Sequence, residues 1–134
     1  MFAPNTKILV TDDSAAMRLM IISALKGLGF TDFEQAGNGY AGLQALKTAA
    51  ASGKPVELIF SDQNMPDCTG LEFLGKVRAQ PKFADIPFIV ITSETAREVM
   101  MELLEAGASS VLPKPFSPES IKSKLQAVYA RSRK

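Results

Sequence analysis

The chain has 134 residues, enough for one domain with a proper core and too few for two ordinary domains. Its 15 basic and 14 acidic residues leave a net charge of +1, which gives no general attraction to nucleic acid or to a membrane surface. The sequence contains no histidine, which excludes histidine-ligated metals, Ser-His or Cys-His catalytic pairs and a phosphohistidine carried by the chain itself.

Hydropathy and cysteine content indicate a cytoplasmic protein. No apolar run approaches the ~18 residues of a membrane span, and the N-terminus lacks a basic-then-apolar signal pattern. Cys68 is the only cysteine, so an intrachain disulfide cannot form and a reducing compartment suits the chain. We therefore expect a cytoplasmic monomer that binds neither nucleic acid nor membrane.

Strand-like and helix-like segments alternate along the whole chain. Strands are predicted near residues 6–11, 33–36, 56–61, 87–91 and 109–112, and helices near residues 14–28, 39–52, 70–80, 95–106 and 118–131. Strict alternation predicts a parallel sheet with helices on both faces. The third and fourth strands are almost wholly apolar, as strands covered on both faces are. The chain ends directly after the fifth helix, so we expect one domain over residues 1–134, with its core at 6–130 and no attached output domain.

Two segments have the spacing of a helix capping box. Thr69 with Glu72 would open the third helix, and Thr95 with Glu98 would open the fourth. In such a box the threonine hydroxyl and the glutamate carboxylate each accept a hydrogen bond from the other residue's backbone N–H.

Four predicted strands lead to residues that can handle a phosphoryl group. These residues are Asp12 with Asp13, then Asp62, Thr92 and Lys114. In an open parallel sheet, ligands bind outside the carboxyl ends of the strands. We therefore expect three carboxylates, a hydroxyl and an ammonium group to meet at one edge of the sheet.

The three carboxylates point to a divalent cation. Two carboxylates about 4 Å apart repel by roughly 4 kcal/mol at an effective dielectric constant near 20. Mg²⁺ relieves such repulsion and prefers oxygen ligands, and Mn²⁺ is a possible substitute. Asp12 and Asp13 alone would be better explained as acidic residues at a helix N-terminus. Asp62, at the end of another strand, favours the metal, because a helix cap needs no third carboxylate.

The other candidate residues are ambiguous one at a time. Asp62 begins an Asp-x-Asn turn before a proline, yet a carboxylate held on a metal can also attack phosphorus. Thr92 could simply lead into a helix. Lys114 could be a solvated lysine, although it lies between two prolines, and its ammonium group could neutralise charge on a phosphoryl group. Their shared location is the reason to group them.

Together these residues resemble the receiver domain of bacterial response regulators, and in architecture the free-standing CheY-like chemotaxis receivers. The motifs that carry the resemblance are Asp12-Asp13, Asp62 with Met65-Pro66 and Gly70-Leu71, Thr92-Ser93-Glu94, Ala106-Gly107-Ala108 and Lys114-Pro115-Phe116. The resemblance covers residues 6–130. It implies a doubly wound, flavodoxin-like three-layer α/β sandwich whose five parallel strands have the order 2-1-3-4-5.

The resemblance also implies a role for each site residue. Asp62 would be the phosphoacceptor. Asp13, Asp62 and the backbone carbonyl of Asn64 would hold Mg²⁺, with Asp12 contributing through water. Thr92 would move toward the phosphoryl group.

Lys114 would pair with that group, and its bond to Pro115 would be cis. The phosphoryl donor would be a phosphohistidine on a partner, either a sensor histidine kinase or a histidine phosphotransfer protein. Such an external donor agrees with the absence of histidine from this chain.

One position departs from the family pattern. Receivers usually carry Tyr or Phe three residues before the lysine, and here that switch position holds Val111. A valine lacks the bulk and hydroxyl of a two-position latch. At two other positions, Asn64 and Glu94 are polar, as in receivers that reset quickly. We expect them to modulate hydrolysis of the acyl phosphate, with a phosphorylated lifetime of minutes or less.

The fourth predicted helix is apolar over an unusually wide arc. Its segment Val99–Leu104 carries five apolar residues that sweep roughly 200° of the helical wheel, against about 100° for a core-facing stripe. We expect Met100, Met101 or Leu104 to be exposed unless neighbouring helices cover them. The surface of the fourth helix, fifth strand and fifth helix would then bind a downstream target.

The function predicted is a signalling switch and not an enzyme. A haloacid-dehalogenase-type phosphatase is the main alternative, but it carries a second Asp where this chain has Asn64. A flavodoxin-like binding module would place a phosphate beside Asp12 and Asp13, which repel it unless a metal intervenes. A degenerate scaffold receiver would not need the intact set of site residues. Chemotaxis and an intermediate step of a phosphorelay both remain open.

Overall fold

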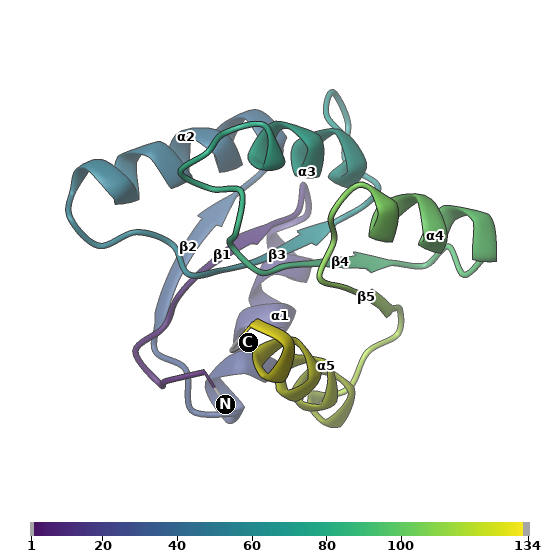
Figure 1. Cartoon of the computed structure of the whole chain (residues 1–134). Helices are drawn as coiled ribbons and strands as arrows, with labels where there is room; N and C mark the ends of the chain where they lie inside the picture. Colours follow the sequence, from purple (N-terminus) through teal and green to yellow (C-terminus); the bar gives the residue numbers. More distant parts are fainter. Residues whose placement is uncertain (1, 133–134) are drawn as a thin grey trace.

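The computed structural model describes residues 2–132 and contains one five-stranded parallel sheet in the order β2-β1-β3-β4-β5 (Figure 1). The strands are β1 (Lys7–Thr11), β2 (Asp32–Ala36), β3 (Leu58–Asp62), β4 (Phe88–Thr92) and β5 (Ser110–Pro113). The helices are α1 (Ala15–Gly27), α2 (Gly39–Ala51), α3 (Gly70–Arg78), α4 (Arg97–Glu105) and α5 (Pro118–Ser132). The predicted fold class and strand order are confirmed.

Helices cover both faces of the sheet. Figure 1 shows α2, α3 and α4 on one face and α1 and α5 on the other. Successive side chains of a strand point to opposite faces, so Leu9 joins the core under α2 and α3 while Ile8 and Val10 join the core under α1 and α5. Every residue of β3 and β4 is buried, as their apolar sequences predict.

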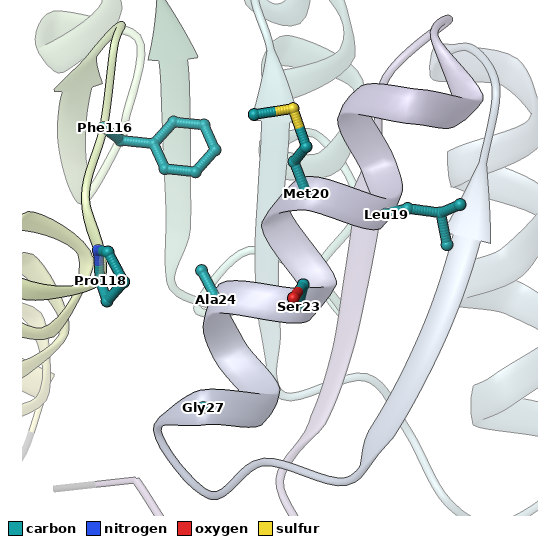
Figure 2. Close-up of a pocket in the computed structure, with 7 residues that line it drawn as sticks. All are labelled: Leu19, Met20, Ser23, Ala24, Gly27, Phe116 and Pro118. Atoms are coloured by element: carbon teal, nitrogen blue, oxygen red, sulfur yellow. The ribbon is translucent and has the colours of Figure 1, made fainter.

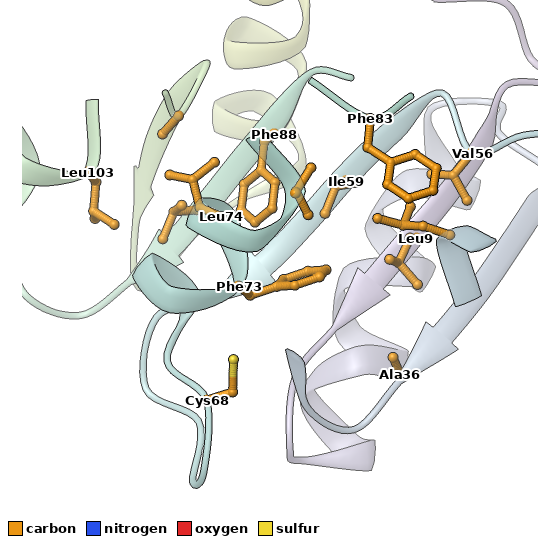
Figure 3. Packing of buried hydrophobic residues seen from close by; sticks show 14 of the residues in the cluster. Leu9, Ala36, Val56, Ile59, Cys68, Phe73, Leu74, Phe83, Phe88 and Leu103 are labelled. Carbon is orange, nitrogen blue, oxygen red and sulfur yellow. The ribbon is translucent and has the colours of Figure 1, made fainter. Parts of the chain in front are cut away.

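The core on the α2–α3 side is built around aromatic packing. Phe73 of α3 and Phe88 of β4 have ring centroids 5.4 Å apart at a tilt of 59°, and Figure 3 shows them between α3 and the sheet. A Cβ added to Gly42 of α2 would lie 2.7 Å from the Phe73 ring, so the two helices approach as closely as a glycine allows. This contact fixes the position of α3, which follows the loop after Asp62.

The boundaries of β3 and β4 differ slightly from those predicted. Asp62 and Thr92 are the last residues of their strands and do not follow them, so both side chains start from rigid backbone. The predicted domain of residues 1–134 includes residues 1 and 133–134, which lie outside the described part. Among residues 2–132, no helix combines the length and apolar character that crossing a membrane requires.

One of the two predicted capping boxes is present. Glu72 N–H donates to Thr69 Oγ1 at 3.1 Å, and Thr69 N–H donates to Glu72 Oε1 at 2.9 Å. The prediction for Thr95 and Glu98 is wrong, because α4 begins at Arg97 and its N-cap is Ala96, which makes no side-chain capping bond. The β4–α4 loop extends one residue further than predicted, which places Thr95 too early to reach the first free amides of the helix.

This difference predicts contrasting costs for two threonine substitutions. Thr69→Ala removes a capping bond and should lower the free energy of unfolding by about 1 kcal/mol. Thr95→Ala is the matched control and should change it by less than roughly 0.5 kcal/mol, as surface substitutions do. Urea unfolding of the two variants measures both values. Equal losses would contradict the capping assignment.

Candidate functional site

The end of β1 carries the first two carboxylates of the site. Asp12 N–H donates to Ala36 O at 3.1 Å, which continues the β1–β2 pairing by one residue. Ser14 caps α1 by accepting from Met17 N–H, and its own N–H donates to Asp12 Oδ1 at 2.9 Å. The Asp12 side chain is therefore held inward, and only 2% of this residue is exposed. Asp13 is exposed at the rim.

Asp62 completes the predicted acidic cluster. Asp12, Asp13 and Asp62 each offer a carboxylate oxygen, and these oxygens all lie within 4.8 Å of one another. Asp12 Oδ2 is buried and accepts no hydrogen bond from the described residues, whereas the buried Asp62 Oδ1 lies beside the Lys114 ammonium group. A buried carboxylate oxygen is rarely left without a partner, and a hard divalent cation would satisfy Asp12 Oδ2. The donor set therefore fits a hard divalent cation such as Mg²⁺.

The electrostatics of Asp12 show the cost of this cluster. Burial raises the pKa of the Asp12 carboxyl above its ordinary value of 3.8, and the charges of Asp62 and Asp13 raise it further. The Ser14 N–H and the Lys114 ammonium oppose the shift but do not cancel it. The charged form of Asp12 is thus destabilised until a cation joins it.

Lys114 provides the positive charge at the other side of Asp62. Its Nζ lies 2.9 Å from Asp62 Oδ1 as an ion pair. Lys114 N–H donates to Thr92 O at 2.9 Å, which ties the end of β5 to the end of β4. The bond between Lys114 and Pro115 is cis, as the resemblance implies. The fold therefore brings together two residues that are 52 positions apart in the chain, counted as 114 minus 62.

Thr92 lies at the buried floor of the same edge. It has no exposed surface, and its Oγ1 accepts a hydrogen bond from Glu94 N–H at 3.0 Å. That bond uses a lone pair of the oxygen, so the hydroxyl proton remains available to donate. Glu94 itself is exposed at the start of the β4–α4 loop.

The loop after Asp62 is held close to the strand end. A Cβ added to Gly70 would lie 2.6 Å from Asp62 O, so only glycine allows α3 to begin so near β3. Gln63 Oε1 accepts from Leu71 N–H at 2.8 Å and fastens the helix start to the loop. Asn64 is exposed two residues after Asp62. Its proposed carbonyl contact to a metal stays a prediction.

Two further residues near the site are buried in the core. Val111, at the switch position, is 4% exposed and pairs with Val90 of β4. It belongs to the core under α2 and α3. Cys68 is 1% exposed, and its Sγ packs directly against the backbone of Gly39 at the start of α2. Burial raises the pKa of the Cys68 thiol, and nearby Glu72 adds to the effect. This thiol is not at the surface.

An apolar groove of about 680 Å³ lies beside the site, between α1 and the start of α5. Figure 2 shows Phe116 and Pro118 facing Met20 and Ala24 of α1 across it. A second hollow of about 370 Å³ shares Met20 and Phe116 and reaches Lys114. The groove therefore continues toward Lys114 at the edge of the acidic cluster. No sequence pattern predicted it, because it depends on how two distant helices meet.

The exposed residues predicted for the fourth helix are confirmed. Met101 is 46% and Leu104 is 49% exposed, whereas Met100 is half-buried and Leu103 is fully buried. An apolar surface therefore runs along the outer side of α4, away from the sheet.

The structure also shows a residue that the sequence did not single out. Arg18 of α1 donates through Nη1 to Asp12 O at 2.6 Å and through Nε to Gln35 Oε1 at 3.0 Å. A single arginine on a helix is ordinarily a solvated cation, so the residue type alone did not predict a role for Arg18 at the site. Its position four residues after the Ser14 cap was the available clue, since it places Arg18 one turn above the acidic pair.

Sequence comparisons agree with this geometry. The model of the response regulator receiver domain family matches residues 8–126. A chemotaxis protein CheY homolog of Campylobacter jejuni is 37% identical over 122 residues, which cover 91% of this chain and 91% of that protein. Chemotaxis protein CheY1 of Helicobacter pylori is 37% identical over 122 residues, 91% of this chain and 95% of its own.

Solved structures show the same architecture. The chemotaxis response regulator CheY4 of Vibrio cholerae has a TM-score of 0.79 at 36% identity, covering 92% of this chain and 98% of its own. A chain of the CheX-CheY-BeF3-Mg²⁺ complex from Borrelia burgdorferi has a TM-score of 0.83 at 19% identity, covering 92% and 88%, and this likeness shows the fold alone. The chain therefore belongs to the response regulator receiver domain family, in which it is similar to the CheY proteins of chemotaxis.

Proposed function

We propose that this protein is a phosphoacceptor switch of a two-component system, phosphorylated on Asp62 and reset by hydrolysis. The ion pair between Lys114 Nζ and Asp62 Oδ1, 2.9 Å long and beside two more carboxylates, is the observation that carries the proposal. CheY-like receivers are signalling switches and not ordinary enzymes. A single-domain chemotaxis-type regulator in the cytoplasm is the form that we favour, with a phosphorelay intermediate as the alternative.

The transfer step forms one bond and breaks one. A carboxylate oxygen of Asp62 attacks the phosphorus of a phosphohistidine, and the bond from phosphorus to the imidazole nitrogen breaks with its electrons left on nitrogen. Water later attacks the acyl phosphate, releasing inorganic phosphate and restoring the Asp62 carboxylate. When bound by Asp12, Asp13, Asp62 and the Asn64 carbonyl, Mg²⁺ would neutralise charge on the phosphoryl oxygens.

The surrounding side chains stabilise the group in transfer. The Lys114 ammonium offsets negative charge on one phosphoryl oxygen, and the Thr92 hydroxyl donates to another. Because the Thr92 hydroxyl also accepts from Glu94 N–H, a shift of Thr92 toward the phosphoryl group would pull on the β4–α4 loop. That loop leads directly into α4. Val111 takes no part in an aromatic latch, so this backbone link is the route that we propose for the signal.

Two exposed apolar surfaces suit two kinds of partner. The groove between α1 and α5 continues into the hollow that contains Lys114, so we assign it to the phosphohistidine-bearing donor, which must approach Asp62 over this edge. The outer side of α4, where Met101 and Leu104 are exposed, is assigned to the downstream target together with β5 and α5. Methionine-bearing surfaces suit adaptable binding.

Loading of Asp62 by a small phosphodonor tests the proposal directly. With acetyl phosphate and Mg²⁺, intact-mass spectrometry should show one added phosphoryl group in the wild type and none in Asp62→Asn. Lys114→Ala should load on the order of 10² times more slowly, because a preorganised charge partner is lost. Lys122→Ala, which removes an exposed lysine of α5, is the control and should load normally. A wild type that stays unlabelled would refute the switch.

Metal binding should stabilise the protein in a pH-dependent way. At a Mg²⁺ concentration about 100 times Kd, the free energy of unfolding should rise by about 2.7 kcal/mol. Because burial raises the pKa of Asp12 in the folded state, the metal-free protein loses stability as pH rises through that pKa, and Mg²⁺ binding weakens as pH falls through it.

Asp12→Asn isolates this effect. At neutral pH the variant should be more stable than the wild type without Mg²⁺ and should gain less on its addition, because one repelling carboxylate is gone. Thermal unfolding of both proteins with and without Mg²⁺ measures the difference. The same gain in both proteins would show that Asp12 is not part of the metal site.

The polar residues beside the site set the phosphorylated lifetime in this proposal. Asn64 and Glu94 are both exposed at the rim, where they can position an attacking water. Phosphate release from the loaded protein should have a half-life of minutes or less with Mg²⁺, and Asn64→Ala or Glu94→Ala should lengthen it severalfold. Thr95→Ala, one residue further along the loop, is the control. A wild-type half-life of many hours would contradict this role.

A further inference from the structure

The side chain of Arg18 joins three elements that surround the acidic cluster. It starts from the first turns of α1, crosses the end of β1 and reaches the end of β2. Its Nη1 donates to Asp12 O at 2.6 Å and its Nε to Gln35 Oε1 at 3.0 Å. Its Nη1 also lies 3.8 Å from the point where a Cβ of Gly37 would stand, so the guanidinium rests against the β2–α2 turn.

The carbonyl that Arg18 holds belongs to the peptide between Asp12 and Asp13. Asp12 N–H donates to Ala36 O, so hydrogen bonds fix the backbone on both sides of Asp12. Rotation of the Asp12–Asp13 peptide would turn the directions of both side chains. Arg18 prevents this rotation with a planar group whose donors point in fixed directions. The cluster that depends on this peptide has its three carboxylate oxygens within 4.8 Å.

The contacts of Arg18 indicate that it acts through geometry. Its donors are directed at a main-chain oxygen and an amide oxygen, not at a carboxylate. A lysine at this position would keep the positive charge but could not span both acceptors with a rigid fork.

We propose that Arg18 is a positioning residue for the divalent cation, which sets the spacing of the Asp12 and Asp13 carboxylates by holding the peptide between them. This inference rests on the metal site of the proposed function. It assigns the residue no contact with the metal or with the phosphoryl group. Partners that orient metal ligands in this way ordinarily change metal affinity by about 10- to 100-fold when they are lost.

Calorimetric titration of the unphosphorylated protein with MgCl₂ tests the assignment. Arg18→Ala should weaken Mg²⁺ binding by about 10-fold or more. Arg18→Lys should weaken it nearly as much. Gln35→Ala, a change at an exposed side chain, removes only the outer anchor of the guanidinium and should have an intermediate effect. Lys26→Ala, which removes an exposed cation from the last turn of the same helix, is the matched control and should bind as the wild type does.

A second measurement separates positioning from a merely structural role. Acetyl phosphate loading of Arg18→Ala at saturating Mg²⁺ should approach the wild-type rate, because Asp62, Thr92 and Lys114 are untouched. Lowered thermal stability with unchanged Mg²⁺ affinity would overturn the inference, and so would full rescue by Arg18→Lys. If Arg18→Ala does not fold, unchanged affinity in Gln35→Ala and Arg18→Lys would overturn it equally. A wild type that binds no Mg²⁺ or accepts no phosphoryl group would instead refute the proposed function.

Discussion

Asp12, Asp13 and Asp62 bring three carboxylates within 4.8 Å of one another, and Lys114 brings one ammonium group to the same place. One positive charge cannot balance three negative charges, so these four side chains by themselves carry excess negative charge. Burial raises the pKa of the Asp12 carboxyl, and the charges of Asp62 and Asp13 add to that shift. A divalent cation would bring the formal charge of these four side chains to zero.

The sheet makes this imbalance possible. Asp62 and Thr92 end two strands that are buried on both faces, so their backbones cannot yield to the repulsion. Gly70 lets α3 begin against Asp62 O, and Lys114 N–H is tied to Thr92 O. The folding energy of the two hydrophobic cores thus holds the polar residues in an arrangement that they would not adopt by themselves.

The sequence was sufficient to predict the fold and the position of the acidic cluster. Alternating apolar segments predict the parallel sheet, and the rule that ligands bind at the carboxyl ends of strands then brings Asp12, Asp62 and Lys114 together. These inferences succeed because they depend on local periodicity and on topology, not on side-chain contacts.

The remaining features depend on tertiary contacts that local patterns do not contain. Thr95 and Glu98 have the same spacing as Thr69 and Glu72, but Thr95 belongs to the β4–α4 loop and precedes the N-cap of α4. Arg18 donates to Gln35 of β2, and the sequence pattern of α1 does not predict that partner. The groove beside Met20 likewise exists only because α1 and α5 cover the same face of the sheet.

The packing of Cys68 against Gly39 gives the protein a built-in probe of its own dynamics. The Cys68 sulfur lies beneath the start of α2, where a Cβ added to Gly39 would collide with it. The thiol is therefore buried from a reagent while α2 stays packed against it. Modification of this cysteine therefore requires the start of α2 and the loop that carries Cys68 to separate. The rate at which a thiol reagent reacts with Cys68 would report how often the loop between β3 and α3 separates from α2.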